Sequence, residues 1–170
     1  MSIILSELRI QHATKKYLSW LKDFETNRYT EFRYQNHSIV TIKKYITNNI
    51  RSRNSYLYGI FIKKKNKKKI HIGNVKLGEI NFIHKFGEIS YFIGEKKYLN
   101  KKIGYKAIKI VLNLAKKKLN LRKIYAGTYS NNIISKKVLL KSGFNHEAKI
   151  KKKFLFNNIY VDHEIFSINL

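Results

Sequence analysis

Hydrophobic positions recur at helical spacing in two segments near the start of the chain. In residues 12–23 the aromatic and leucine side chains fall on one broad face that includes Tyr17 and Trp20. In residues 38–50 isoleucine recurs at every third or fourth position, and Ser38 precedes the run as a suitable N-cap. Both patterns predict amphipathic helices that bury one face against a core.

Later segments show the patterns of strands and of two further helices. Runs of β-branched and aromatic residues predict strands at about 56–63, 69–83, 87–93, 123–129, 144–154 and 159–168. Helical spacing predicts helices over 103–119 and 131–144, the second ending at Gly143. The basic run 63–69 lies between two strands and predicts an exposed hairpin turn around Asn66.

The order of these elements indicates the fold class. A first strand, two helices, three strands, a helix, a strand, a helix and two strands predict an α/β protein with a mixed sheet and helices on both faces. With 170 residues and no Gly/Ser/Pro linker, we expect a single domain over 1–170.

Composition narrows the class of protein. Hydrophobic residues make up 44% of the chain, and no apolar run approaches the roughly 20 residues of a membrane span. Cysteine is absent, which excludes disulfides and thiolate chemistry. The start of the chain lacks the features of a secretory signal, so we expect a cytoplasmic protein.

The net charge is +26, from 36 Lys and Arg against 10 Asp and Glu. Such a charge attracts polyanions, including nucleic acid and phosphorylated small ligands. The joint abundance of Lys, Asn, Ile, Tyr and Phe is also typical of an AT-rich genome, in which many surface lysines carry no function. Nucleic-acid binding is therefore possible but not favoured.

The segment YLNKKIGYKA, residues 98–107, joins a predicted strand to the helix that begins near Ile103. The first turn of a helix presents unpaired N–H groups and partial positive charge, and Lys102 and Lys106 add cations. These features are compatible either with an anion site around Gly104 or with a basic surface turn.

A downstream motif favours the anion site. Asn132 and Ser135 stand in an N-x-x-S pattern, followed by a helix that ends in Gly143 and Phe144. Together with GEISYFIG and YVDHEIF, the region from about 70 to 168 resembles the GNAT superfamily of acetyl-CoA-dependent N-acetyltransferases. It is most similar to the branch that contains RimJ/RimL-type enzymes and amino-sugar acetyltransferases. The resemblance implies a central, mostly antiparallel sheet of six to seven strands flanked by about four helices.

The resemblance also implies a site for acetyl-CoA and no metal. The pyrophosphate loop of the family, Q/R-x-x-G-x-G/A, corresponds here to LNKKIG. Leu99 replaces Gln or Arg, Lys102 replaces the first glycine, and Gly104 keeps the second. A lysine forced to a positive φ at that position costs about 1–2 kcal/mol. The implied cofactor-binding residues are Phe92, Ile93, Lys102, Ile103, Gly104, Tyr105, Lys106, Asn132 and Ser135.

In such enzymes the amine attacks the thioester directly, so a carboxylate, or a water hydrogen-bonded to one, must accept a proton from the amine. The first candidate base is Glu88, followed by Glu79 and His84, which are also candidate substrate contacts. Many members carry a tyrosine acid where this chain has Leu139, so Ser135 or water is the candidate proton donor.

The acceptor is expected to lie against the N-terminal helices, where DFETNRYTEFR mixes acids and arginines. Arg28 or Arg33 are candidates for binding a diphosphate, Glu31 for binding an ammonium, and Tyr29 for lining the site. The predicted acceptor is a small-molecule amine, most simply a nucleotide-linked amino sugar of a surface-polysaccharide pathway.

Two alternative functions stay open. One is acetylation of a protein N-terminus, and the other is a non-catalytic basic module that binds RNA or ribosomes on a decayed acetyltransferase fold. The positive charge disfavours a polyamine acceptor, and a homodimer is possible.

Overall fold

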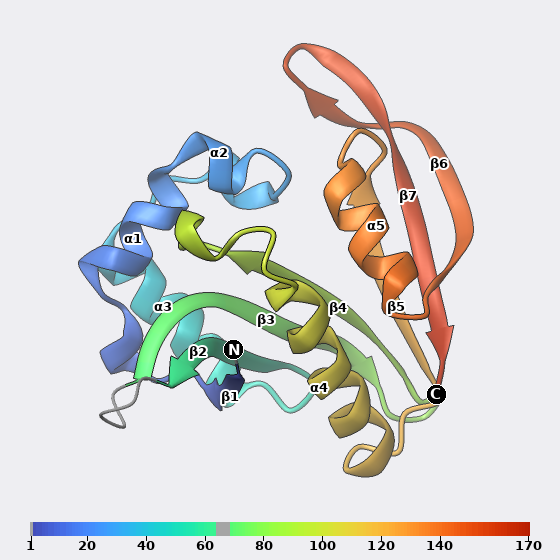
Figure 1. The fold of residues 1–170 in the computed structure, drawn as a ribbon, viewed down its shortest axis with the longest axis horizontal. Coiled ribbons are helices and arrows are strands. Elements are labelled where there is room, and N and C mark those ends of the chain that lie inside the picture. The colour runs from blue at the N-terminus through green and yellow to red at the C-terminus, as the bar shows by residue number, and fades with distance from the viewer. Residues whose placement is uncertain (1, 64–68) are drawn as a thin grey trace.

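The computed structural model describes residues 2–63 and 69–170. Its centre is a seven-stranded sheet in the order β1-β2-β3-β4-β5-β7-β6 (Figure 1). The strands are β1 (Ile3–Glu7), β2 (Tyr56–Lys63), β3 (Lys69–Asn81), β4 (Phe86–Ile93), β5 (Lys123–Tyr129), β6 (Asn145–Phe156) and β7 (Ile159–Asn169). The predicted strands and the mixed sheet are confirmed, while the turn predicted around Asn66 lies outside the described residues.

All neighbouring strands run antiparallel except β4 and β5, which are parallel. This parallel pair is short, because only residues 86–88 of β4 pair with residues 123–125 of β5. Beyond Glu88 the two strands diverge, so residues 89–93 have no partner on the β5 side. The sheet therefore opens at its centre, with β1–β4 on one side and β5–β7 on the other (Figure 1).

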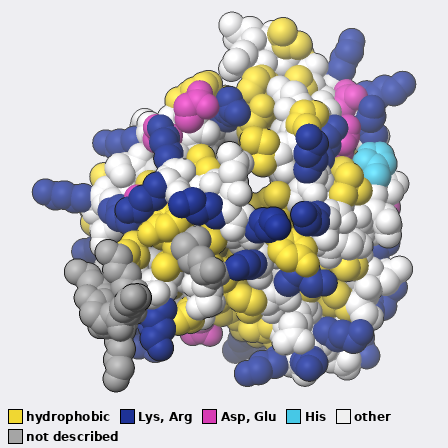
Figure 2. Space-filling model, viewed as in Figure 1, with side chains coloured by type: hydrophobic (Ala, Val, Ile, Leu, Met, Phe, Trp, Pro, Cys, Tyr) yellow, Lys and Arg dark blue, Asp and Glu magenta, His cyan; other side chains and the backbone are white. Residues whose placement is uncertain are grey.

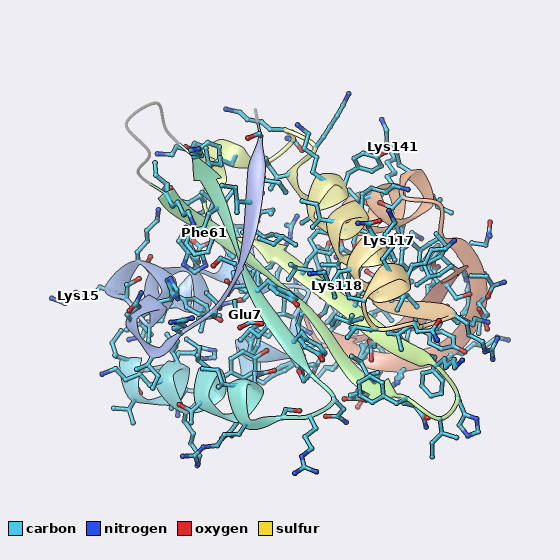
Figure 3. The ribbon with its side chains drawn as sticks, turned by 90° about the horizontal axis from the view of Figure 1, so that it is seen from below. Glu7, Lys15, Phe61, Lys117, Lys118 and Lys141 are labelled. Atoms are coloured by element: carbon cyan, nitrogen blue, oxygen red, sulfur yellow. The ribbon has the colours of Figure 1, made fainter. Side chains whose placement is uncertain are left out.

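Helices cover both faces of the sheet, as the sequence predicts. The helices α1 (Lys15–Lys22) and α3 (Ile39–Arg51) contribute to a hydrophobic cluster on one face, around Tyr17, Trp20 and Ile46. The helices α4 (Ile103–Lys117) and α5 (Ile133–Lys141) cover the other. Figure 3 shows α3 and α4 on opposite sides of the sheet.

The helix ends follow local side-chain chemistry. Ser38 accepts a hydrogen bond from the Thr41 amide and caps α3, as predicted. The short helices α2 (Phe24–Asn27) and η2 (Glu31–Tyr34) were not predicted. They are too short for hydrophobic periodicity to be detected.

Lys and Arg side chains are distributed over the face of the molecule in Figure 2 rather than gathered in one stripe. In the part of the chain that the structure describes, no helix combines the length and apolar character needed to cross a membrane.

Candidate functional site

The segment between β4 and α4 places helix amides at the open centre of the sheet. Lys102 is the N-cap of α4, with φ 58° and ψ 21°, in the left-handed region that favours glycine. Its side chain makes no capping hydrogen bond, so the first-turn amides of α4 keep no side-chain acceptor. These amides and the partial positive charge of the helix terminus can bind an anion.

A groove of about 500 Å³ lies beside this helix start, between α4, the end of β4 and the first turn of α5. It brings together the predicted cofactor-binding residues, with the exception of Lys106. These are Phe92, Ile93, Lys102, Ile103, Gly104, Tyr105, Asn132 and Ser135. The unpaired edge of β4 runs along it, so backbone groups of this strand can pair with an extended ligand.

Gly104 lets α4 begin directly against Tyr91. A Cβ atom at Gly104 would lie 2.6 Å from Cε2 of Tyr91, closer than any normal contact. The glycine, the first-turn amides and the unpaired strand edge together fit a ligand with a phosphate group and an extended arm. Acetyl-CoA has this chemistry.

Asn132 has the local role considered from the sequence and also lines the groove. Its side-chain oxygen accepts a hydrogen bond from the Ser135 amide at 3.1 Å and caps α5. This cap holds Ser135 at the wall of the groove.

Tyr91 was not predicted as a site residue. It lines the groove together with Ser135, and burial raises the pKa of Tyr91 to about 12. The signal in the sequence was its place in SYFIG, alternating with residues of the opposite face. That pattern alone predicts only a side chain packed against a helix.

A second cavity, of about 300 Å³, opens on the other side of Tyr91 and is called the acceptor cavity below. Its walls come from α1, η2, α3 and strands β3–β5. The groove and this cavity share Tyr29, Thr30, Tyr91, Phe92, Asn132 and Ser135. Two ligands bound in these spaces would meet at Tyr91 and Ser135.

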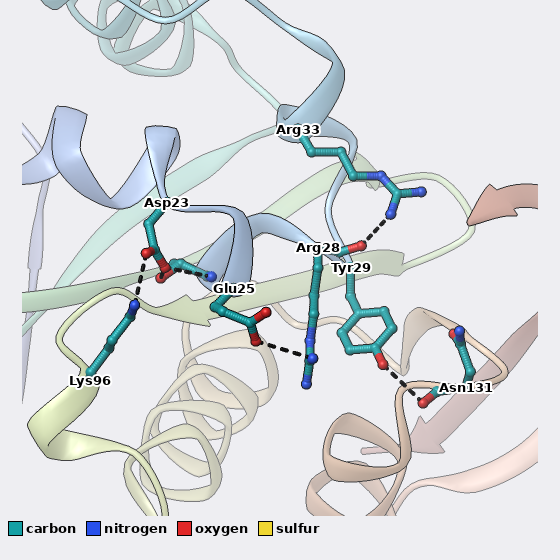
Figure 4. A network of polar contacts seen from close by, with 8 residues as sticks. Asp23, Glu25, Arg28, Tyr29, Arg33, Lys96 and Asn131 are labelled. Atoms are coloured by element: carbon teal, nitrogen blue, oxygen red, sulfur yellow. Dashed lines mark hydrogen bonds and ion pairs between the residues drawn. The ribbon is translucent and has the colours of Figure 1, made fainter. Parts of the chain in front are cut away.

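Two of the predicted substrate contacts line the acceptor cavity. Glu31 accepts a hydrogen bond from the hydroxyl of Tyr129 at 2.5 Å, and it is the only acid among the described lining residues. Burial, followed by the contact with Glu31, raises the pKa of Tyr129. Tyr29 donates to the carbonyl oxygen of Asn131 at 3.2 Å (Figure 4).

The two arginines are engaged elsewhere. Arg28 forms an ion pair with Glu25 at 3.1 Å and lines the groove rather than the acceptor cavity (Figure 4). Arg33 lies outside the walls of both cavities. Its guanidinium donates to the carbonyl oxygens of Arg28 and Leu155, because η2 and the β6–β7 hairpin meet there.

The candidate bases occupy a different place. Glu79 and Glu88 line a separate hollow of about 210 Å³, together with Tyr125 and His163. His84 lies exposed in the turn between β3 and β4 and lines none of these spaces. The structure therefore does not bring Glu79, Glu88 or His84 into direct contact with the acceptor cavity.

Glu88 is nevertheless close to the point where the sheet opens. It lies on the same face of β4 as Ser90, which lines the acceptor cavity, and Gly127 lines both spaces. Its carboxylate is accessible to solvent, yet partial burial, followed by the charge of Glu79, raises the pKa of Glu88. A raised pKa suits a group that exchanges protons near neutral pH.

A family comparison accounts for this arrangement. The model of the acetyltransferase (GNAT) domain matches residues 2–145, which is most of the chain. The chain belongs to the GNAT acetyltransferase family. The family and the fold predicted from the sequence are thereby confirmed.

The probable N-acetyltransferase YjcK of Bacillus subtilis (strain 168) is 34% identical over 80 residues, which cover 47% of this chain. The aligned region spans 44% of the length of YjcK.

Solved structures of GNAT proteins share the whole fold. Spermidine N-acetyltransferase from Vibrio cholerae, in complex with CoA and spermine, has a TM-score of 0.84 at 21% identity. The match covers 98% of this chain and 95% of that one. RimL, a ribosomal L7/L12 alpha-N-protein acetyltransferase in complex with CoA, has a TM-score of 0.85 at 15% identity, covering 100% and 95%. At these identities the likeness is one of fold.

In residues 2–63 and 69–170, no group of three or more His, Asp or Glu side chains is placed to bind a metal ion.

Proposed function

We propose that this protein transfers the acetyl group of acetyl-CoA to a primary amine of a small, oxygen-rich molecule, with an amino sugar as the substrate class. The observation that carries this proposal is the meeting of two cavities at Tyr91 and Ser135, where the sheet opens between β4 and β5. A groove with helix amides on one side and a cavity of mixed polar and apolar lining on the other support a reaction between two bound substrates.

The groove residues bind and orient acetyl-CoA in this proposal. The first-turn amides of α4, with Lys102, face its phosphates, and the unpaired edge of β4 pairs with its extended arm. A backbone amide of β4 near Phe92 donates to the thioester oxygen as charge develops there. Acetyl-CoA supplies the acyl group.

Two carboxylates have separate roles. Glu31 lines the acceptor cavity and binds the ammonium form of the acceptor. We retain Glu88 as the general base, reached through solvent past Gly127, because its raised pKa suits proton acceptance. Replacement of each carboxylate by its amide separates the roles: E31Q should raise KM for the amine, and E88Q should lower kcat.

Ser135 is the proposed proton donor to the leaving thiolate. Its hydroxyl lies on the wall that the two cavities share, beside the protonated hydroxyl of Tyr91. Leu139, at the position of the tyrosine acid found in many relatives, is buried and lines the acceptor cavity, but its side chain has no proton to donate.

The cavity chemistry favours a polar, compact acceptor. Tyrosine, amide and hydroxyl side chains share its walls with aliphatic and Phe side chains, and Lys76 is the only Lys or Arg among the described lining residues. The sequence analysis expected Arg33 to bind the diphosphate of a nucleotide-linked amino sugar. In the structure Arg33 instead donates to backbone carbonyl oxygens, so this contact does not favour the nucleotide-linked form. Free and nucleotide-linked forms therefore both belong in the test.

The test is a thiol-release assay with acetyl-CoA and four amines: glucosamine, a nucleotide-linked amino sugar, a short peptide with a free N-terminus, and spermidine. We expect the highest kcat/KM for one of the two amino sugars. Preference for the peptide would support the alternative of protein N-terminal acetylation. No thiol release with any of them, although acetyl-CoA binds, would contradict the proposed activity.

A further inference from the structure

Asn74 is a buried amide in the wall of the acceptor cavity whose hydrogen-bonding capacity is not used up within the protein. Its side chain is 2% exposed, and it lies on β3 opposite Phe92 of β4. The amide nitrogen Nδ2 has no hydrogen-bond partner among the described residues. Buried polar atoms are almost always paired in native proteins, so an unpaired donor facing a cavity indicates a ligand.

A hydrogen bond with His71 fixes the orientation of the Asn74 side-chain amide. Nε2 of His71 lies 2.7 Å from Oδ1 of Asn74. Burial lowers the pKa of His71 to about 4, so the ring is neutral at pH 7 and donates one N–H to this oxygen. The ring centroid of His71 lies 4.9 Å from those of both Trp20 and Phe61, which hold it in place. The Nδ2 atom is thereby directed to the cavity side.

The neighbouring side chains on this wall are a cation and two hydroxyls, and a hydroxyl can both donate and accept a hydrogen bond. Lys76 lies two residues further along β3 on the same face, and Tyr17 and Tyr45 add hydroxyls. Burial, reinforced by Tyr45, raises the pKa of Tyr17, and the Asn74 amide opposes that shift. Asn74 is therefore near the Tyr17 hydroxyl, yet Nδ2 makes no well-formed hydrogen bond with it. Glu31 is the only carboxylate among the described lining residues.

We propose that Asn74 determines acceptor specificity by donating a hydrogen bond to an oxygen atom of the acceptor, and that it selects oxygen-bearing amines over polyamines. This inference rests on the proposed function, because it concerns the same cavity. A hydroxyl, carbonyl or carboxylate oxygen of the acceptor accepts a hydrogen bond from Nδ2 and satisfies this buried donor. The ammonium arm of a polyamine carries donors only, so it cannot accept from Nδ2 and leaves this buried atom unpaired.

The experiment compares two acceptors of similar ring size, glucosamine and cyclohexylamine, in wild type and in Asn74→Leu. The leucine removes the donor and keeps the volume. We expect kcat/KM for glucosamine to fall at least tenfold, chiefly through KM, while kcat/KM for cyclohexylamine changes less than twofold. The control is Asn113→Leu, an exposed asparagine on α4 outside both cavities, which should change neither value.

A second variant reverses the hydrogen-bonding sense. Asn74→Asp keeps the size of the side chain and its acceptor for His71, but it presents a carboxylate oxygen to the cavity. We expect it to lower kcat/KM for glucosamine and to raise kcat/KM for 1,3-diaminopropane, a diamine without oxygen. A merely structural role of Asn74 would lower both values together and would overturn the proposal.

Calorimetric binding of glucosamine separates this inference from the proposed function. If wild type releases no thiol but binds glucosamine at least tenfold more tightly than Asn74→Leu, the acetyl transfer is refuted and the recognition by Asn74 stands. If wild type acetylates glucosamine and both acceptors respond equally to Asn74→Leu, the recognition is refuted and the transfer stands. Absence of both binding and turnover refutes both.

Discussion

Lys102 has a backbone conformation that glycine adopts more easily, at the start of the helix proposed to bind phosphates. Its φ of 58° is the positive value expected from the glycine that usually occupies this position in the family loop. Lys102 also lines the groove. In the proposed site, its strained backbone therefore comes together with a cation beside the phosphates of the ligand. The backbone of YLNKKIGYKA therefore has a strained N-cap at Lys102, and we propose that this helix start is an anion site.

Replacement of Lys102 by glycine should separate the two effects. We expect K102G to raise the free energy of unfolding by up to about 1 kcal/mol, because relief of the left-handed strain exceeds the entropy cost of glycine. The KM for acetyl-CoA should rise about threefold to tenfold, since one cation near the phosphates is lost. Denaturant unfolding and steady-state kinetics measure the two values. A lower KM would show that Lys102 obstructs the phosphates.

Glu88 should make stability depend on pH in a defined direction. Its pKa is raised in the folded protein by burial and by Glu79, so the protonated form is favoured. Its contribution to stability is present below the ordinary carboxyl pKa and is lost as pH rises through the folded value. We therefore expect E88Q to be more stable than wild type at pH 7 and to lose that advantage near pH 4. Thermal unfolding across this range measures it, and an equal difference at both pH values would contradict the account.

At the scale of elements, Arg33 joins η2 to the β6–β7 hairpin, two segments distant in the sequence. Its guanidinium donates to carbonyl oxygens on both sides and lies over the rings of Tyr129 and Phe156 at 5.1 Å. This contact holds one wall of the acceptor cavity, which includes Glu31, against the second half of the sheet. Arg33 thus positions the site without lining it.

Loss of this contact should affect the acceptor more than acetyl-CoA. We expect R33L to lower the free energy of unfolding by about 1–2 kcal/mol, because the carbonyl oxygens of Arg28 and Leu155, which are not fully buried, lose a charged donor. The KM for the amine should rise at least fivefold, while the KM for acetyl-CoA stays within twofold. The exposed Arg53 provides a matched control in R53L. A larger effect on acetyl-CoA than on the amine would refute this positioning role.

The sequence predicted the long elements well, because their hydrophobic periodicity and caps are local. Ser38, Asn132 and Gly143 mark helix ends in the sequence, and the structure shows caps at Ser38 and Asn132 and a positive φ at Gly143. Residues that meet across the open sheet were harder to predict. Tyr91 and Asn74 owe their importance to the divergence of β4 from β5 and to an unpaired buried atom, and neither feature has a sequence signature. The hydrogen bond from Arg33 to the carbonyl oxygen of Leu155 could not be predicted either, because the two residues are 122 positions apart in the sequence.

At the scale of the whole molecule, the net charge of +26 surrounds a site for an anionic co-substrate. Long-range attraction should raise the association rate and the apparent affinity for acetyl-CoA, and salt screens it. We expect the KM for acetyl-CoA to increase steadily between 50 and 500 mM salt, with no such increase for the acceptor cyclohexylamine, which is a cation at neutral pH. Steady-state kinetics at several ionic strengths measures this. A KM for acetyl-CoA that does not change with salt would show that the surface lysines play no part.

The central claim is that the groove and the acceptor cavity form one site for acetyl transfer. The most direct test is the transfer of an isotopically labelled acetyl group from acetyl-CoA to glucosamine, followed by mass spectrometry of the sugar. The account predicts label on the amine nitrogen with wild type and a strong reduction with Ser135→Ala. Unlabelled sugar from wild-type protein that demonstrably binds both acetyl-CoA and glucosamine would contradict it.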